Sequence, residues 1–299
     1  MASITAKNQL NENIYEIEVN APRISTKGKP GQFVIIRLHD KGERVPLTLA
    51  DTNPKRGSIT LVFQVQGKTS LELSLMSVGD DIKNVVGPLG KPTEIEKFGT
   101  VVLLGGGCGC APVYPQVKAL HDAGNQVICI MGFKNKDFVF WEKKMAAVCD
   151  ELIITTDDGS YGRKGFTTTI LKDLIEEGHR IDRIISIGPL IMMANTVKIT
   201  KPANIPTIVS LNALMVDGTG MCGSCRVTTP EGIKFSCVDG PDMNGFEIDF
   251  EELMNRNSKY QEHEQKSLSK FTEKCKCEER LEHIQPCAIP DKIKKEDGA

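Results

Sequence analysis

The first hundred residues alternate between apolar and polar positions in short runs, which is the pattern of half-buried β-strands. The clearest runs are rich in β-branched residues and cover positions 14–19, 32–38, 58–65 and 81–86. Turn-forming residues separate them, as in the KGKPG segment at 27–31 and the Asn-Pro pair at 53–54. Short strands at this spacing predict an antiparallel barrel over residues 1–97.

The pattern changes near residue 100, where compact apolar runs alternate with helical stretches. Strands are predicted over 101–104, 126–131, 152–155, 183–187 and 207–210, and helices from the next glycine cluster to about 123 and over 137–148, 167–177 and 191–199. Five strands that alternate with helices predict a parallel, doubly wound α/β domain over residues 98–210. A loop rich in Gly and Cys follows at 211–245. Residues 246–299 form a charged tail, predicted to be helical and to dock a partner.

Composition excludes several classes of function. Among the 299 residues, 37 Lys and Arg stand against 39 Asp and Glu, so the net charge of −2 offers no basic surface for nucleic acid or an anionic membrane. No apolar run approaches the length of a membrane span, and the N-terminus lacks the apolar core of a signal peptide, so we expect a cytoplasmic protein. Ten cysteines in such a protein indicate metal or redox chemistry rather than disulfides.

The cysteines of the loop have the spacing of an iron–sulfur site. Cys222, Cys225 and Cys237 fall on the second, third and fourth positions of the plant-type C-x4-C-x2-C…C pattern, and Asp217 takes the first. Glycines between them allow the tight turns that direct backbone amides at sulfur. We predict a 2Fe–2S cluster with Asp217 as an oxygen ligand. The alternatives are a zinc site, ordinary buried cysteines, or a turn-forming Asp217 with the fourth ligand supplied by water or another chain.

The apolar run at 101–104 leads into the segment GGGCGCAP, residues 105–112. A strand, a glycine turn and a helix together place free amides and the positive helix end against a phosphate, so we predict dinucleotide contacts there. Cys110 takes the third glycine position of the G-x-G-x-x-G pattern, so a plain strand–helix turn is the alternative. The candidate residues are Gly107, Cys108, Gly109, Ala111 and Pro112.

Two later segments follow predicted parallel strands, at the sheet edge where such domains bind ligands. Asp157 and Asp158 follow the third strand, and an acidic group beside a ribose favours NAD(H) over NADP(H). The same pair is equally typical of a solvated turn. Gly188, Pro189 and Met192 follow the fourth strand and are candidates for contact with the same cofactor.

In the barrel, two polar segments follow apolar strands and suit a flavin nucleotide. Arginine neutralises diphosphates and hydroxyl groups bond flavin rings, although a surface arginine and an ordinary hairpin explain the same residues. The flavin candidates are Arg44, Pro46, Leu47, Thr48, Val62, Phe63, Gln64, Gly67, Thr69 and Ser70.

These segments occur in the order found in the ferredoxin–NADP reductase superfamily, which the chain resembles over residues 1–245. The segments are 44–48, 67–70, GPLG at 87–90, 105–112 and 188–193. With the cysteine loop appended, the chain resembles the electron-transfer subunit of dihydroorotate dehydrogenase and, more closely, the small subunit of NADH-dependent reduced ferredoxin:NADP⁺ oxidoreductase. Arg44 lies one residue further from Thr48 than in the R-x-Y-[ST] motif, and the pair Pro46-Leu47 replaces the aromatic residue. Asp217 departs from the four-cysteine loop usual in the dihydroorotate subunits.

The resemblance implies FAD on the barrel, NAD(H) on the α/β domain and a 2Fe–2S cluster in the loop. Electrons would pass from NADH through FAD to the cluster, and then to a larger partner with flavin and 4Fe–4S clusters, in a bifurcating heterodimer that couples NADH, NADP(H) and ferredoxin. Hydride transfer needs no side-chain base, so the site residues position cofactors and none is predicted to be catalytic. An electron-transfer subunit for dihydroorotate oxidation is the nearer alternative, and a zinc-holding, non-enzymatic assembly module is the more distant one.

Three cysteines of the tail, Cys275, Cys277 and Cys287, fall outside these motifs. Their spacing is compatible with a further metal site, formed within this chain or together with a partner chain. The alternative is a solvated or partner-docking helix that carries reduced thiols.

Overall fold

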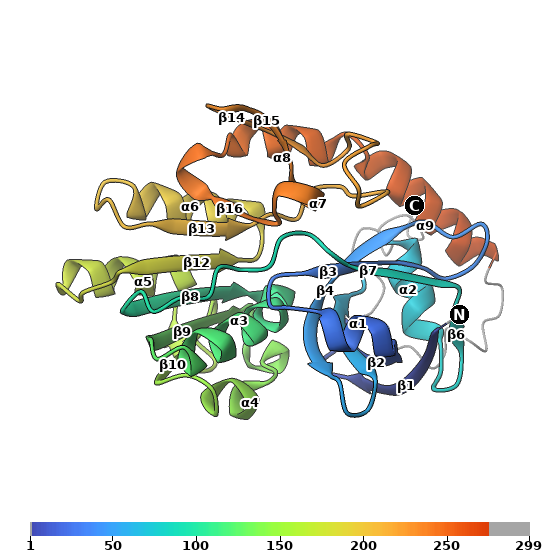
Figure 1. Ribbon diagram of the computed structural model, residues 1–299, viewed down its shortest axis with the longest axis horizontal. Coiled ribbons are helices and arrows are strands. Elements are labelled where there is room, and N and C mark those ends of the chain that lie inside the picture. The colour runs from blue at the N-terminus through green and yellow to red at the C-terminus, as the bar shows by residue number, and fades with distance from the viewer. Residues whose placement is uncertain (1, 275–299) are drawn as a thin grey trace.

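The computed structural model describes residues 2–274, and two seven-stranded sheets organise them (Figure 1). The first sheet is antiparallel, in the order β6-β1-β2-β5-β4-β3-β7. Its strands are β1 (Ala2–Gln9), β2 (Ile14–Asn20), β3 (Phe33–Arg37), β4 (Val45–Asn53), β5 (Ser58–Gln64), β6 (Asp81–Ile82) and β7 (Asn84–Leu89). It curls around a core of fully buried aliphatic side chains such as Ile17, Val34 and Leu61. The predicted antiparallel barrel is confirmed in the form of a half-barrel.

Two strands and two short helices of this half-barrel are not visible in the sequence pattern. β1 has polar residues at five of its eight positions, and β4 contains Pro46, which lacks the N–H that a strand normally contributes to its sheet. The helices are α1 (Pro22–Lys27) and α2 (Lys68–Leu75). Both are shorter than an isolated helix needs to be, so tertiary packing and not local propensity stabilises them.

The second sheet has the order β11-β10-β9-β8-β12-β13-β16, and parallel strands form its body. These are β8 (Thr100–Gly106), β9 (Gln126–Phe133), β10 (Glu151–Thr156), β12 (Arg183–Ile187) and β13 (Thr207–Ser210). Helix α3 (Cys110–Asp122) covers one face, and α5 (Thr167–Glu176) and α6 (Leu190–Thr200) cover the other. The predicted five-stranded, doubly wound sheet is confirmed. Two short edge strands extend it, the parallel β11 (Arg163–Lys164) and the antiparallel β16 (Asp242–Asn244).

The helix predicted over 137–148 is wrong in its extent. The structure has a 3-10 turn at Lys136–Phe138 and a five-residue helix, α4 (Glu142–Ala146), with Trp141 between them in the left-handed backbone region (φ 56°). The indole N–H of Trp141 donates to Glu16 of the half-barrel at 2.9 Å. A contact between the two sheets therefore interrupts a segment whose local pattern favours helix.

The rest of the chain runs back across the molecule toward the half-barrel (Figure 1). It comprises the hairpin β14 (Arg226–Thr229) and β15 (Gly232–Phe235), then α7 (Ser236–Asp239), the 3-10 turn Gly245–Glu247, α8 (Phe250–Ser258) and α9 (Gln261–Lys274). The described part of the tail is therefore helical, as predicted. Leu268 of α9 is buried in the half-barrel core, so this helix packs on its own chain, and docking of a partner by the tail stays a prediction. The cysteines at 275, 277 and 287 lie outside the described residues.

None of the helices in residues 2–274 is both long enough and apolar enough to span a membrane.

Candidate redox site

Two glycine segments meet at the carboxyl ends of β8 and β12, which are neighbours in the parallel sheet. A Cβ added to Gly109 would lie 2.5 Å from the Ile187 carbonyl oxygen and 2.9 Å from Gly188 Cα. A Cβ added to Gly106 would lie 2.6 Å from Met192 Sδ. The structure therefore joins the two predicted nicotinamide segments into one surface. It lies where the strand order reverses, the point at which such sheets bind dinucleotides.

The start of α3 completes this surface. Gly107 has a left-handed backbone (φ 55°), and Pro112 lies within the first helical turn, where its missing N–H costs nothing. Cys110 and Ala111 are buried against the sheet. Burial raises the pKa of the Cys108 thiol to about 12, so it is neutral at physiological pH. The turn thus presents backbone amides, and no anion, to a phosphate.

Asp157 and Asp158 follow the end of β10, two strands away from β8 in the same sheet. Neighbouring strands are about 4.8 Å apart, so this turn lies roughly 10 Å along the edge from the glycine surface. Hydrogen bonds from Ser160, including its amide N–H at 2.9 Å, lower the pKa of Asp158. Partial burial and the adjacent Asp158 raise the pKa of Asp157. Asp158 therefore closes its own turn, which makes Asp157 the better candidate for a ribose hydroxyl.

Two of the three predicted flavin residues of β4, Pro46 and Thr48, lie on the outer face of the half-barrel, whereas the side chain of Leu47 points inward. Leu47 packs against the core, so the alternation of the strand turns Pro46 and Thr48 outward. The strand register sets Pro46 beside Ile35 and Thr48 beside Phe33, both on β3. Those two β3 side chains are buried in the same apolar cluster as two cysteines of the loop. The flavin candidates of β4 and the cysteine loop are therefore on one side of the half-barrel.

The three candidates at the end of β5 have different surroundings. Phe63 points into the half-barrel core and stacks on Tyr15, with ring centroids 5.8 Å apart. Val62 packs in the cluster that contains α3, and Gln64 accepts a hydrogen bond from Gln66. The burial of Phe63 leaves its backbone, and not its ring, for contact with a flavin.

The remaining flavin candidates surround the start of α2. Ser70 Oγ accepts the Gly67 amide N–H at 3.0 Å, so this hydroxyl caps the helix. A Cβ added to Gly67 would meet nothing within 4 Å, which leaves the helix start accessible to a phosphate. Thr69 Oγ1 donates to Glu43 Oε2 at 2.6 Å, whereas no hydrogen bond or ion pair joins Arg44 to another described residue. Glu43 and not Arg44 therefore reaches this helix, and the predicted contact of Arg44 with a diphosphate stays a prediction.

The cysteine loop arranges its four candidate ligands as two pairs. Cys225 and Cys237 are buried side by side, and burial together with the neighbouring thiol raises the pKa of Cys237. Asp217 and Cys222 form the outer pair, in which Asp217 Oδ2 accepts the Cys222 amide N–H at 2.8 Å. Within residues 2–274, no group of three or more Asp, Glu, His or Cys side chains lies close enough together to hold a metal ion. The exposed Cys222 has to turn inward if all four are to share a cluster.

The backbone of the loop fits an iron–sulfur cluster. Gly218, Gly220 and Gly223 have φ values of 74°, 82° and 67°, in the region that favours glycine. The Gly220 amide donates to the Cys237 sulfur, and this bond favours the thiolate. Three thiols, one carboxylate and amides directed at sulfur make a donor set that suits iron.

Gly218 presses the loop directly onto the half-barrel. A Cβ added there would lie 2.7 Å from Leu89 Cδ1 and 2.8 Å from Ile35 Cδ1. Because Ile35 is paired with Pro46, the loop lies one strand away from the predicted flavin face. This contact brings the flavin and iron–sulfur candidates close together.

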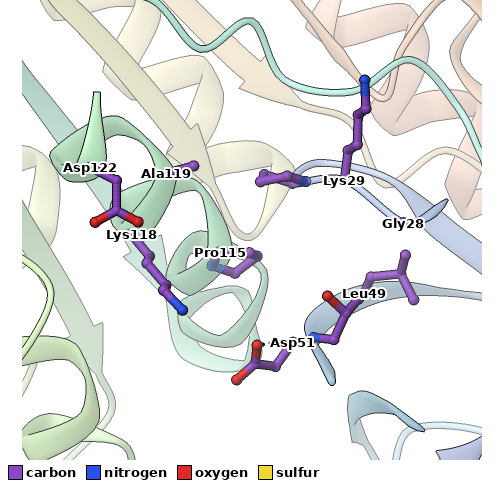
Figure 2. Close-up of a pocket in the computed structure, with 10 residues that line it drawn as sticks. Gly28, Lys29, Leu49, Asp51, Pro115, Lys118, Ala119 and Asp122 are labelled. Atoms are coloured by element: carbon purple, nitrogen blue, oxygen red, sulfur yellow. Dashed lines mark hydrogen bonds between the residues drawn. The ribbon is translucent and has the colours of Figure 1, made fainter. Parts of the chain in front are cut away.

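A separate pocket of about 200 Å³ opens between β4 and α3 (Figure 2). Leu49, Pro115 and Ala119 give it apolar walls, and Asp51 and Asp122 add carboxylates. None of the residues predicted to bind a cofactor lines it. The pocket therefore marks the seam between the half-barrel and the α/β domain.

Comparison with known proteins assigns this architecture. Residues 212–249 match the family model of the iron–sulfur cluster binding domain of dihydroorotate dehydrogenase B. The dihydroorotate dehydrogenase B (NAD(+)) electron transfer subunit homolog of Thermotoga maritima is 46% identical over 268 residues, 90% of this chain and 94% of that protein. The chain belongs to the dihydroorotate dehydrogenase B electron transfer subunit family.

Solved structures resemble this electron transfer subunit at two levels. A chain of NADH-dependent reduced ferredoxin–NADP oxidoreductase, a subject of work on flavin-based electron bifurcation, is 44% identical with a TM-score of 0.86, over 91% of this chain and 98% of that one. The ferredoxin reductase of carbazole 1,9a-dioxygenase, at 17% identity, shares the fold with a TM-score of 0.57, over 69% and 65% of the two chains.

The electron transfer subunit thus unites a ferredoxin reductase fold for FAD and NAD(H) with an iron–sulfur domain, as part of a multisubunit oxidoreductase. The match to an iron–sulfur domain decides against the zinc alternative for the loop. The identity of each ligand in this subunit stays a prediction.

Asp217→Cys tests whether Asp217 is a ligand of the electron transfer subunit. The variant is expected to keep its cluster and to change the cluster's midpoint potential and EPR spectrum, because a carboxylate oxygen is a harder donor than a thiolate. Redox titration followed by EPR measures both. Thr219→Cys, which adds a thiol to the same loop at a non-ligand position, is the control. A potential and spectrum equal to those of the wild type would rule Asp217 out as a ligand.

Proposed function

We propose that this chain is the NAD(H)-side subunit of a NADH-dependent reduced ferredoxin:NADP⁺ oxidoreductase, whose larger subunit holds a further flavin and 4Fe–4S clusters. The observation that carries the proposal is the loop with Asp217 and three cysteines, seated one strand from the flavin face. The 44% identity with a chain of such a complex over nearly its full length supports it.

Each part of the chain has a positioning role in this reaction. The amides of the turn at Gly107 and the start of α3 would hold the diphosphate of NADH, and Asp157 would hold a ribose. The outer face of β4 and the start of α2 would hold FAD. When bound, FAD divides the electron pair of NADH into single electrons and the 2Fe–2S cluster carries them one at a time. The chain itself supplies no general base, because hydride transfer requires none.

The rim of the cysteine loop fits a permanently bound partner. Val216, Met221 and Val238 are 39%, 89% and 42% exposed. Met221 directly precedes the exposed Cys222, and Val216 directly precedes Asp217, the partner of the Cys222 amide. Gly220 joins this group, since its Cβ position is 3.1 Å from Val238 Cγ2. Single exposed apolar residues are ordinary, but a group of them around a redox centre is typical of the core of an interface. We call Val216, Met221 and Val238 the loop rim and assign the larger subunit to it.

Met221→Asp is expected to weaken binding of the larger subunit about 10-fold or more, because an ionised carboxylate would be buried in an apolar interface. Flavin reduction by NADH in the free subunit should be unchanged. Titration calorimetry measures the first and stopped-flow absorbance the second. Val78→Asp, at a 58% exposed apolar residue before β6, is the control. Wild-type affinity in Met221→Asp would exclude the loop rim as the interface.

The electron transfer subunit of a dihydroorotate dehydrogenase is the second candidate, supported by the family of the loop and by the relative from Thermotoga maritima. Purification of the tagged full-length chain from its native source, with identification of the bound subunit, separates the two. A partner with flavin and 4Fe–4S clusters is the expected result. A dihydroorotate dehydrogenase as the partner would overturn the proposal.

A further inference from the structure

A buried carboxyl group joins separate parts of the chain near the end of the cysteine loop, after Cys237. Asp242 lies on β16, where its backbone is paired with that of Ser210 on β13. Asp242 Oδ2 accepts the hydroxyl of Thr93 at 2.6 Å and the Nε2 amide of Gln116 at 3.1 Å. Thr93 belongs to the connection between the half-barrel and β8, and Gln116 is fully buried on α3. One carboxyl group thus links the end of the iron–sulfur segment to the domain connection and to the helix of the nicotinamide surface.

Two oxygens at this junction lack a donor. Asp242 Oδ1 and Gln116 Oε1 are both buried and accept no hydrogen bond from any described residue. With Asp242 ionised, both are unsatisfied acceptors, and a buried acceptor without a donor destabilises the folded protein. A proton on Oδ1 supplies the missing donor. The acceptor available for that proton is Gln116 Oε1, the other oxygen without a partner. Because the Gln116 amide already donates to Asp242 Oδ2, the two side chains would then form a carboxylic acid–amide pair.

The charges around Asp242 do not compensate a buried carboxylate. Arg183 on β12 is the cation that acts on it, but its guanidinium forms an ion pair with Glu94 at 2.7 Å. Lys91, close to Thr93, pairs instead with Asp239 at 3.8 Å. Among the described residues, α3, β13 and the loop at Gly31 bring only neutral groups to it: the side chains of Gln116 and Ser210, whose hydrogen bonds lower the pKa of Asp242, and backbone. Burial is the dominant influence and raises the pKa of Asp242.

We infer that Asp242 carries a proton in the folded protein, and that its carboxylic acid is a positioning group that fixes the iron–sulfur segment against α3 and the domain connection. The backbone makes a parallel link, since the Lys91 amide donates to the Gly240 carbonyl at 2.6 Å. The packing there is tight: a Cβ added to Gly31 would lie 3.1 Å from Asp242 Oδ2. The protonation stands independently of the proposed function, whereas the positioning of the cluster rests on it.

The pH dependence of stability tests the protonation. Asp242→Asn keeps the shape of the side chain and its donor but cannot ionise. As pH rises from the unfolded-state pKa of about 3.9 to the raised pKa of the folded state, the wild-type folding constant should fall about tenfold per pH unit relative to that of the variant. The folded wild type retains a proton in this window that the unfolded chain has lost. Urea unfolding of the full-length chain from pH 4 to 8 measures the ratio, with the exposed Asp137→Asn as the control.

Infrared spectroscopy gives a second readout that does not depend on unfolding. At pH 7 the wild-type chain should show the carbonyl band of a protonated carboxylic acid, and Asp242→Asn should lack it. Absence of this band in the wild type, with folding constants that run parallel to those of Asp242→Asn at every pH, would show that Asp242 is ionised and overturn the protonation.

Asp242→Ala, which removes the hydrogen bonds, tests the positioning. Flavin reduction by NADH should keep its wild-type rate in the reconstituted protein, and cluster reduction should slow about tenfold or more. Equal rates of cluster reduction in the variant and the wild type would overturn the positioning role. A wild-type chain that binds no flavin or cluster would instead overturn the proposed function, and the infrared and stability results would still decide the protonation.

Discussion

Cys225→Ser is expected to lower the iron content of the purified chain about 100-fold and to abolish the visible absorption of a 2Fe–2S cluster. Cys225 is fully buried beside Cys237, and this pair is the inner half of the predicted site. A thiolate is the soft ligand that an iron–sulfur cluster uses, whereas a serine hydroxyl is a hard donor that stays protonated at neutral pH. Mutation of a residue that only orients a metal ligand typically lowers metal affinity 10- to 100-fold. Loss of the ligand itself is expected to have an effect at least as large as the upper end of that range.

Cys149→Ser is the control for this experiment. Cys149 is a half-buried thiol after α4, and its sulfur donates to the Met145 carbonyl at 3.3 Å, a bond that serine can also make. This variant should contain as much iron as the wild type. Iron and acid-labile sulfide analysis together measure the result. A Cys225→Ser chain with wild-type iron content would show that the cluster is held elsewhere.

Gly109→Ala is expected to lower kcat/KM for NADH about 100-fold. The backbone of Gly109 is in the ordinary helical region (φ −61°), so alanine brings no conformational cost of its own. The penalty is steric, because the added methyl group would lie 2.5 Å from the Ile187 carbonyl oxygen. The nearest atoms, the Ile187 carbonyl oxygen and Gly188 Cα, both belong to the backbone and cannot move aside as a side chain would. The two glycine segments would therefore have to separate. A displacement of about 1 Å at a site that orients a hydride is sufficient for an effect of this size.

Gly124→Ala is the matched control for Gly109→Ala. A Cβ added to Gly124 would meet nothing within 4 Å, although its φ of 82° makes alanine unfavourable by about 1 kcal/mol. This variant should lose stability and keep the wild-type rate with NADH. Stopped-flow reduction of the flavin measures kcat/KM, and circular dichroism confirms that both variants are folded. An unchanged rate in Gly109→Ala would remove the glycine surface from the nicotinamide site.

Local patterns predict most of the parallel sheet because each of its strands is a compact apolar run bounded by turn residues. The candidate nicotinamide surface follows from topology, since glycine turns after β8 and β12 have to meet when those strands are neighbours. Other features depend on contacts that are remote in sequence. Glu16 draws the Trp141 indole into a left-handed break, and pairing with β3 makes a strand of β4 in spite of Pro46. No window of sequence contains both partners of such contacts.

The candidate iron–sulfur ligands are the part of the site that the sequence indicates most directly, because they fall at a recognisable spacing within one short loop. The outward turn of Cys222 and the burial of Cys225 are not visible in that spacing. The flavin site is less predictable, because it is assembled from separate strands and a helix. There Glu43 reaches Thr69 in place of the neighbouring Arg44. The contact between Asp242 and Gln116 cannot be predicted from local sequence, because the two residues are 126 positions apart in the chain.

The most direct test of the central claim, that electrons from NADH pass through the flavin to the loop cluster, is an anaerobic NADH titration of the full-length chain reconstituted with FAD, iron and sulfide. Flavin absorbance and the EPR signal of the reduced cluster are recorded on the same samples. We expect the flavin to bleach and the EPR signal to appear in the wild type, and the flavin alone to bleach in Cys225→Ser. A wild-type flavin that bleaches while the cluster stays oxidised would contradict the account.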